Sequence, residues 1–311
     1  MSEMKEHHLK APVAFLVFNR PDTTTRVFEA IRVARPPKLL IVADGPRADK
    51  PGEAERCAAV RRIIDGVDWP CEVLKNYSDI NLGCKRRVSS GLDWVFNTVE
   101  EAIILEDDCL PHPTFFRFCE ELLDRYRDDE RVAMISGDNF QFGKRRTEYS
   151  YYFSIYPHIW GWASWRRTWK LYDVGMRSWP EIRNGRWLSD IFGDGRTARY
   201  WSDIFERTYR NEIDTWDHQL TFALCAMKGL VILPNINLVA NIGFGAGASH
   251  TGSRSFVANL PVEPMVFPLQ HPPFMARDTV ADHFTHGIIY DPGFLLKVRL
   301  KLGLASGPPA R

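Results

Sequence analysis

The first 139 residues alternate between two hydrophobic patterns, and this alternation constrains the fold more than any other feature. Short runs of strand-forming residues occupy residues 12–19, 38–45, 71–77, 102–108 and 132–139. Between them, apolar residues recur at helical spacing in residues 23–34, 53–64, 81–99 and 114–126. Buried strands that alternate with helices are typical of a mostly parallel sheet covered on both faces. We therefore predict an α/β fold.

Polar residues follow the predicted strands at the point where each strand ends. In open parallel sheets, ligands bind beyond the carboxyl ends of the strands, and these ends share one edge of the sheet. The residues that we expect at this edge are Asn19, Arg20, Asp44, Glu106, Asp107, Asp108, Asp138 and Asn139. The pattern thus indicates a binding site there.

The composition excludes several classes of protein. The formal net charge of +1 gives no basic excess with which to neutralise a nucleic acid, so we expect no nucleic-acid partner. The six cysteines have neither CxxC nor CxH spacing, which argues against a zinc site or a disulfide framework and fits a reducing cytosol. The first apolar run, "VAFLVF", is too short for a signal peptide or a membrane span. We expect a cytoplasmic protein.

The chain changes character near Gly143. Residues 149–157 are predicted to form an edge strand, residues 159–173 an aromatic turn and a short helix, and residues 215–229 a longer helix. Residues 235–255 are rich in Gly, Ser and Asn and are expected to form a loop, and residues 260–275 are Pro-rich. We divide the chain into a ligand-binding half (12–142), a second half of the same domain (143–255) and a C-terminal extension (256–311).

The C-terminal extension has two interpretations. Its segment "GFLLKVRLKLGL", residues 293–304, mixes Leu and Val with Lys297, Arg299 and Lys301. A short basic amphipathic segment of this kind can lie on the inner, anionic face of a membrane. Alternatively, it is a helix that docks on its own domain.

The triplet Glu106-Asp107-Asp108 concentrates like charges at the end of a buried strand, where they repel unless a cation neutralises them. Carboxylate oxygens suit Mg²⁺ and Mn²⁺, which typically take one or two protein carboxylates and complete their shell with phosphate and water. Successive strand residues face opposite ways, so Glu106 and Asp108 share one side and Asp107 takes the other. The alternative is a solvated acidic turn that caps the next helix.

Several motifs together resemble the GT-A glycosyltransferases. The stretch "ILEDDCLPHPTFF" is the specific one, and "FLVFNRPD", "IVADG", "SGDNF" and "WDHQ" accompany it in order over residues 12–255. The chain resembles in particular the inverting N-acetylglucosaminyltransferase that initiates complex N-glycans, and its bacterial relatives. This resemblance implies a GT-A fold, a Rossmann-like and mostly parallel sheet flanked by helices with a mixed acceptor-binding half. It also implies metal-dependent transfer of a sugar from a nucleotide-diphosphate sugar, with a UDP-sugar expected, to a glycan or lipid-linked acceptor.

The same resemblance assigns the donor-binding residues. Asp108 would bind the Mn²⁺ or Mg²⁺ that bridges the two phosphates of the donor. Glu106 and Asp107 would contact the sugar and nucleoside parts, and Arg20 and Asp44 would line the base pocket.

There are two further donor-binding candidates. One departs from the family pattern, and the other lies in a loop. Arg87 stands where the family has a histidine near the nucleotide, and with Lys85 and Arg86 it can offer positive charge to a diphosphate. For Arg86 a solvated basic face is the favoured interpretation. His250, in the Gly-rich "GFGAGASHTG", is a candidate metal or phosphate ligand on a loop that closes over the donor. A loop histidine without function is the alternative.

For the second half, the resemblance implies a catalytic base at Asp217 in "TWDHQ", where it would take the proton of the acceptor hydroxyl. His218 replaces the second Asp of the family and is the alternative base. A helix-start carboxylate favoured by the macrodipole is the non-catalytic interpretation of Asp217. Asp138 and Trp162 are the acceptor-binding candidates, although core packing is expected for at least two of Trp160, Trp162 and Trp165.

Two rival functions remain open from the residues. A sugar-phosphate nucleotidyltransferase can share the sheet and the acidic site, but it typically has a Gly-rich signature after the first strand, where this chain has "FNRPDTTT". The other rival is a non-catalytic carbohydrate-binding protein that uses the Trp cluster, the tryptophans between Trp160 and Trp216. It would not need Asp108.

Overall fold

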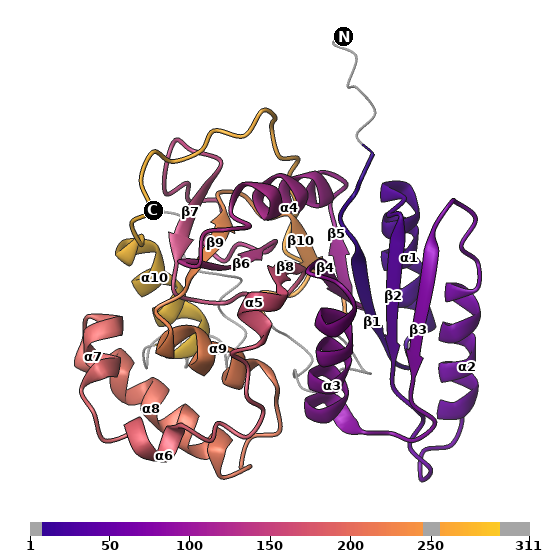
Figure 1. The fold of residues 1–311 in the computed structure, drawn as a ribbon, viewed down its shortest axis with the longest axis horizontal. Coiled ribbons are helices and arrows are strands. Elements are labelled where there is room, and N and C mark those ends of the chain that lie inside the picture. Colours follow the sequence, from indigo (N-terminus) through magenta and orange to yellow (C-terminus); the bar gives the residue numbers. More distant parts are fainter. Residues whose placement is uncertain (1–7, 245–255, 293–311) are drawn as a thin grey trace.

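A computed structural model describes residues 8–244 and 256–292. Its centre is an eight-stranded sheet of order β3-β2-β1-β4-β8-β6-β9-β7, and a two-stranded sheet pairs β10 with β5 (Figure 1). The strands are β1 Val13–Val17, β2 Lys38–Ala43, β3 Glu72–Tyr77, β4 Glu101–Glu106, β5 Cys109–Pro111, β6 Val132–Ser136, β7 Tyr151–Ser154, β8 Trp162–Trp165, β9 Leu230–Pro234 and β10 Val239–Asn241.

Helices connect these strands. They are α1 Pro21–Ala34, α2 Glu53–Ile64, α3 Gly83–Thr98, α4 Thr114–Arg125, α5 Arg166–Trp169, α6 Trp179–Ile182, α7 Trp187–Phe192, α8 Gly195–Tyr209, α9 Asp217–Ala226 and α10 Thr279–Thr285, followed by the π-helical turn η1 His286–Tyr290. None of the helices in the described ranges is long and apolar enough to cross a membrane.

Strand direction decides which residues share an edge. Strands β1, β2, β3 and β4 pair in parallel, and β8 pairs antiparallel with both β4 and β6. Strand β6 therefore has the direction of β4, β9 is parallel to β6, and β7 closes the edge antiparallel to β9. The predicted α/β fold with a mostly parallel sheet is confirmed. The predicted edge strand at residues 149–157 is confirmed as β7.

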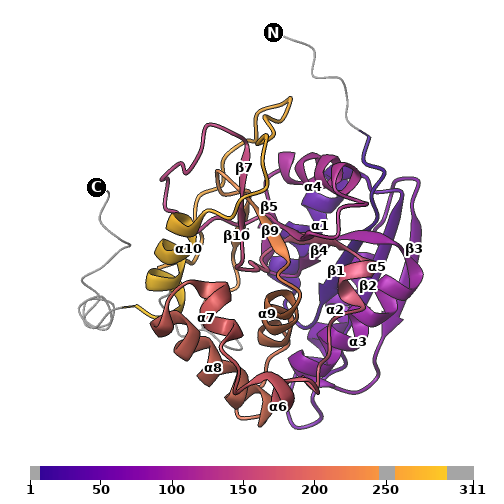
Figure 2. The ribbon, with the colours of Figure 1, turned by 60° about the vertical axis from the view of Figure 1, so that its left-hand side comes forward.

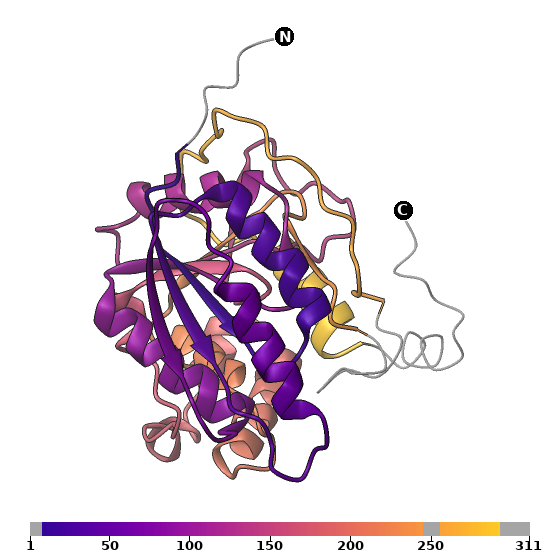
Figure 3. The ribbon, with the colours of Figure 1, turned by 90° about the vertical axis from the view of Figure 1, so that its right-hand side faces the viewer.

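Alternating side chains of the strands feed two cores, one on each face of the sheet. Phe15 of β1 belongs to the core that buries α1, α2 and α4, whereas Leu16 belongs to the core that buries α3 and α9. Figure 3 shows α1 and α2 side by side over one face of β1, β2 and β3. Each fully buried aliphatic or aromatic side chain contributes about 1.5–3 kcal/mol to folding, so this two-sided burial holds the strand ends in place.

A third core, rich in aromatic residues, joins α6, α7 and α8 to α9. Helix α9 contributes Leu220 and Leu224 to the sheet core and Phe222 and Cys225 to this third core, so it is clamped between them. Figure 2 shows α9 between the sheet and α8. The helix that begins at Asp217 is therefore fixed relative to the strand ends.

The structure corrects one element of the sequence interpretation. Residues 162–165, predicted to be part of an aromatic turn, form β8 in the middle of the sheet. All four residues of β8 are buried, so the strand has no polar face and its periodicity is hidden. Gly161 enters it at φ +68, and a Cβ there would lie 2.8 Å from the Val239 side chain.

Several further helices and strands were not predicted. Helices α6, α7 and α8 fill residues 179–209, and β10 lies inside the predicted loop 235–255. Residues 256–292 pack on the domain: the Asp278 amide donates to the Phe153 carbonyl (2.8 Å), and Ala281 is in the sheet core. The segment 293–304, for which membrane contact was considered, lies outside the described residues.

Candidate functional site

The polar residues at the ends of β1, β2, β4 and β6 come together at one edge, because these four strands run in the same direction. Two contacts demonstrate the approach between β1 and β4. The Arg20 guanidinium donates to Asp108 Oδ2 at 2.7 Å, and the Phe18 amide donates to Asp107 Oδ2 at 2.9 Å. The predicted approach is thus shown for the residues that follow β1 and β4.

Of the two carboxylates in these contacts, Asp108 is the more accessible, with 17% of its side chain exposed. The chain after β10 closes over it: the Ile242 amide donates to the Asp108 carbonyl at 2.8 Å. A Cβ at Gly243 would lie 2.1 Å from Asp108 Oδ2 and 2.7 Å from the Arg20 guanidinium. Only a glycine allows the backbone to pass so close to the Arg20–Asp108 ion pair.

Asp107 is a buried acid, and Glu106 is partly buried. Burial, and secondarily the charge of Asp108, raises the pKa of Asp107 to about 7, although the Phe18 amide acts in the opposite direction. Burial, followed by the charges of Asp108, Asp107 and Asp217, raises the pKa of Glu106 to about 8. Within the described residues the Glu106 carboxylate accepts no hydrogen bond. Burial and mutual repulsion thus disfavour the ionised carboxylates at this edge, and a bound cation would favour them.

Asp217 is the first residue of α9, and its charge acts on Glu106. The fold thus brings it within electrostatic range of Glu106, and its role as a base remains a prediction. Its Oδ1 accepts a hydrogen bond from the Thr215 hydroxyl. His218 turns toward α8 instead, with Nδ1 3.2 Å from the Thr208 hydroxyl and its ring edge-on to Trp201. Packing explains His218 within the described structure.

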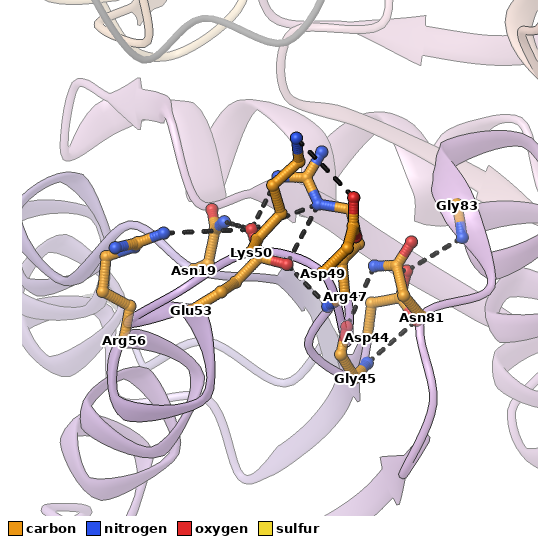
Figure 4. A network of polar contacts seen from close by, with 10 residues as sticks. All are labelled: Asn19, Asp44, Gly45, Arg47, Asp49, Lys50, Glu53, Arg56, Asn81 and Gly83. Atoms are coloured by element: carbon orange, nitrogen blue, oxygen red, sulfur yellow. Dashed lines mark hydrogen bonds and ion pairs between the residues drawn. The ribbon is translucent and has the colours of Figure 1, made fainter.

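Asp44 is a saturated carboxylate. It accepts from the Leu82 amide at 2.9 Å. It also accepts from the Gly45 amide at 2.9 Å and from the Gly83 amide and Asn81 Nδ2 at 3.1 Å (Figure 4). A carboxylate has about four lone-pair sites, and these donors fill them. Burial raises the pKa of Asp44, while the amide donors act in the opposite direction. Asp44 holds the turn that starts α3, and its contact with a nucleotide base remains a prediction.

Arg87 is buried and joins α3 to β3. Its guanidinium donates to the Asn76 carbonyl at 2.6 Å and to Asn76 Oδ1 at 2.7 Å. Burial lowers the pKa of Arg87, and the charge of Asp44 raises it. The side chain thus supports the sheet edge, and a contact with the diphosphate remains a prediction.

Sequence reasoning missed the polar network around Glu53, the first residue of α2 (Figure 4). The Glu53 side chain is 0% exposed and accepts from Asn19 Nδ2 at 2.8 Å, from the Arg47 amide at 2.7 Å and from the Arg47 guanidinium at 2.6 Å. The hydrogen bond from Arg47 lowers the pKa of Glu53 to about 2. An acid in the first turn of a helix, after a glycine, was the available signal. The network fixes the loop between β2 and α2.

Replacement of Glu53 by glutamine is expected to destabilise the fold by about 2 kcal/mol at pH 7, after allowance for screening of the half-exposed Arg47. The folded pKa lies below the ordinary value of 4.5, so the stabilisation is complete above pH 4.5 and is lost as the pH falls toward about 2. Denaturant unfolding of both proteins at pH 7 and pH 3 measures this. Glu55→Gln, an exposed acid in the same turn, is the control. An equal difference at both pH values contradicts the assignment.

The two acceptor-binding candidates are corrected by the structure. Asp138 and Trp162 are each 1% exposed, so neither presents a surface to a sugar. Asp138 accepts from the Trp160 amide at 3.2 Å and lies 3.4 Å from His158 Nδ1; burial raises its pKa well above the ordinary value. Trp162 stacks on Trp216 at 6.1 Å. Core packing of two of the three tryptophans is confirmed, because Trp165 is also buried and only Trp160 is partly exposed.

The residues at this edge fit a metal ion that takes part of its ligands from a bound phosphate compound, not one that is held by protein side chains alone. In the ranges 8–244 and 256–292, no three His, Cys, Asp or Glu side chains form a metal-binding group. Asp108 nevertheless supplies a hard oxygen ligand near Glu106, and phosphate oxygens can complete such a shell. His250, the other candidate ligand, lies outside the described residues.

The fold and the site define the class of this protein: an α/β protein with a Rossmann-like half-sheet, β3-β2-β1-β4, and an acidic site at its strand ends. No protein-family model matches the chain. No curated protein matches it either.

Among solved structures, a UDP-glucose pyrophosphorylase in complex with UDP-glucose is similar to part of the chain. The match has a TM-score of 0.27 and 14% identity, and it covers 48% of this chain and 64% of that one, less than two thirds of its length. A likeness this low carries no conclusion about function.

Proposed function

We propose that this protein is a metal-dependent, inverting GT-A glycosyltransferase. It transfers a sugar from a nucleotide-diphosphate sugar, with UDP as the expected nucleotide, to a hydroxyl of a glycan or of a lipid-linked sugar. The main support is the meeting of the acidic triplet at the end of β4 with Asp217 at the start of α9, because donor binding and proton removal need these groups at one place. The resemblance of the motifs to this family supports the proposal independently.

On the donor side, Asp108 would hold Mn²⁺ or Mg²⁺ together with the diphosphate. The ion would supply positive charge that stabilises the departing diphosphate. Arg20, bonded to Asp108, places a second positive charge at the same point of the edge. Asp107, held on the β1 side by the Phe18 amide, remains the candidate for the nucleoside, and Glu106 the candidate for the donor sugar.

The group transfer needs one base. The acceptor oxygen forms a bond to the anomeric carbon and loses its proton to the Asp217 carboxylate. The bond between that carbon and the diphosphate oxygen breaks, and its electron pair leaves with the nucleoside diphosphate. Attack from the side opposite to the leaving group inverts the configuration. The packing of α9 between two cores, which fixes the start of the helix, supports this role of Asp217.

The rival interpretations have less support. The carbohydrate-binding protein was based on the Trp cluster, and Trp162 and Trp165 are buried. No described feature favours a nucleotidyltransferase over a glycosyltransferase, and the residues after β1 lack a Gly-rich signature.

Calorimetry with UDP, GDP, CDP and dTDP, each with and without Mn²⁺, tests the proposal. We expect one of these, UDP first, to bind with Mn²⁺ and to bind at least tenfold more weakly in EDTA, because the ion links Asp108 to the phosphates. UDP release from UDP-glucose, UDP-galactose and UDP-N-acetylglucosamine then identifies the donor. Failure of all four nucleotides to bind in Mn²⁺ would refute the proposed function.

A further inference from the structure

Trp160 is the tryptophan of the "WGWASW" stretch that remains partly exposed. Trp162 and Trp165 lie in β8 and are buried. Trp162 stacks on Trp216, and the Arg167 guanidinium lies over the Trp165 ring, 4.3 Å from its centroid. In the described part of the chain, no aromatic ring stacks in parallel on Trp160; its ring contacts are perpendicular ones. Packing thus leaves part of Trp160 accessible to a ligand.

The backbone of Trp160 lies at the edge where the acidic triplet is found. Strand β8 runs antiparallel to β4 and β6 and begins at Trp162, opposite Ile104 and Ser136. The residues just before β8 therefore lie where β4 and β6 end. The Trp160 amide confirms this position, since it donates to Asp138 Oδ1, beyond the end of β6, at 3.2 Å.

The turn at Gly161 brings this segment against the end of β4. A Cβ at Gly161 would lie 3.3 Å from Leu105 Cδ2, so the two residues are in direct contact. Leu105 precedes Glu106, the last residue of β4. The chain next to Trp160 therefore packs directly beside the start of the acidic triplet.

The ring of Trp160 reaches the other end of the triplet. Its centroid lies 5.7 Å from that of Phe244 and 5.1 Å from that of Phe140, and both phenyl rings stand nearly perpendicular to the indole, at 78° and 87°. Gly243, the residue before Phe244, is the glycine that passes over Asp108. The indole is thus held beside the segment that covers the candidate metal ligand.

The order of the strands indicates which part of a ligand would meet this ring. Strand β4 lies between β1 on one side and β8 on the other. The Phe18 amide holds Asp107, the candidate for the nucleoside, on the β1 side. Trp160 lies on the β8 side. A nucleotide sugar with its nucleoside toward β1 and its diphosphate at Asp108 therefore extends its sugar toward Trp160.

We infer that the indole of Trp160 stacks on the pyranose ring of the donor sugar. This inference rests on the proposed function and assigns the residue that recognises the sugar part of the donor. A pyranose has C–H groups on its faces and hydroxyl groups around its rim. An aromatic face covers the C–H groups, and the hydroxyl groups are left to polar partners such as Glu106. Trp160 binds the sugar and makes no contact with the nucleotide.

Replacement of Trp160 by leucine tests this, because leucine keeps apolar volume against Phe140 and Phe244 but has no flat face. Calorimetry in Mn²⁺ gives the Kd for UDP and for UDP-glucose, UDP-galactose and UDP-N-acetylglucosamine. For the UDP-sugar that the wild type binds most tightly, we expect Trp160→Leu to raise the Kd about tenfold, the effect of one lost aromatic contact. The Kd for UDP should change by less than about twofold, because UDP has no sugar on its diphosphate.

Two further variants accompany this one. Trp160→Phe keeps an aromatic face and should retain most of the affinity for the UDP-sugar. Trp94→Leu is the matched control, since Trp94 is a partly exposed tryptophan in the second half of α3, and it should bind both UDP and the UDP-sugar as the wild type does.

Each result decides a different question. An unchanged Kd for the UDP-sugar in Trp160→Leu overturns the inference and leaves the proposed function standing. An equal loss of affinity for UDP also overturns it, because Trp160 would then support the shape of the edge and not the sugar. If the wild type binds neither UDP nor any of the three UDP-sugars in Mn²⁺, the proposed function fails and the inference fails with it.

Tryptophan fluorescence decides the question if Trp160→Leu does not fold. A sugar stacked on Trp160 should make the UDP-sugar change the fluorescence of the wild type more than UDP does. This excess should disappear in Trp160→Phe, which has lost the indole. An excess that persists in Trp160→Phe overturns the inference.

Discussion

Sugar transfer by the variant Asp217→Asn is expected to be about 10²- to 10⁴-fold slower than by the wild type, the range of effects for loss of a general base. Asparagine has the shape of aspartate but cannot accept the proton of the attacking hydroxyl. It can still accept the hydrogen bond that Thr215 donates to Asp217, so the start of α9 should be preserved. The rate of UDP release measures the loss. The Kd for UDP with Mn²⁺ should be unchanged, because Asp217 acts on the nucleophile rather than on the diphosphate.

Two control variants separate this role from its alternatives. Asp214→Asn removes an exposed acid three residues earlier and is expected to keep the wild-type rate. His218→Gln tests the other candidate base, and we expect it to keep most of the activity because His218 contacts Thr208 and Trp201. Full activity in Asp217→Asn would show that another group removes the proton. Loss in His218→Gln alone would move the assignment to the histidine.

Asp108→Asn has the second large expected effect, about a 100-fold weaker affinity for UDP in Mn²⁺, which corresponds to about 3 kcal/mol. An amide is a far poorer ligand than a carboxylate for a hard divalent ion. Its oxygen can still accept from the Arg20 guanidinium, so the contact at the end of β1 is retained. Titration calorimetry with UDP at saturating Mn²⁺, and again in EDTA, gives both affinities.

The affinities for UDP measured in EDTA decide whether Asp108 acts through the metal ion. Without the ion, wild type and variant should bind UDP with similar affinity, because Asp108 would act on the nucleotide only through the metal. Asp22→Asn, an exposed acid in the first turn of α1, is the matched control and should behave as wild type in both conditions. An equal loss for Asp108→Asn with and without Mn²⁺ would indicate that Asp108 maintains the shape of the edge instead of binding metal.

Local patterns along the chain were enough to predict the first half of the sheet. The runs at β1, β2 and β4 are apolar on both faces, and the helices between them carry apolar residues on one side. Such patterns depend on neighbours within one turn or one strand, so sequence alone reveals them. The meeting of the strand-end residues Arg20 and Asp108 followed from the parallel direction of the strands.

Side-chain roles at the same edge were harder to predict, because they depend on partners far along the chain. Asp44 looks like a ligand-binding acid, yet amides 38 and 39 residues later saturate it. Trp162 looks like a sugar platform, yet its segment enters the sheet between β4 and β6. Neither outcome has a signature in adjacent residues.

The amino-acid order alone determined that this is an α/β protein whose strands end in a cluster of acids, since periodicity and strand direction are local properties. Only the tertiary structure decided which of those acids remain available and that the start of α9 brings Asp217 within electrostatic range of Glu106. Burial and hydrogen-bond saturation arise from contacts between distant segments, and the packing of the whole chain sets them.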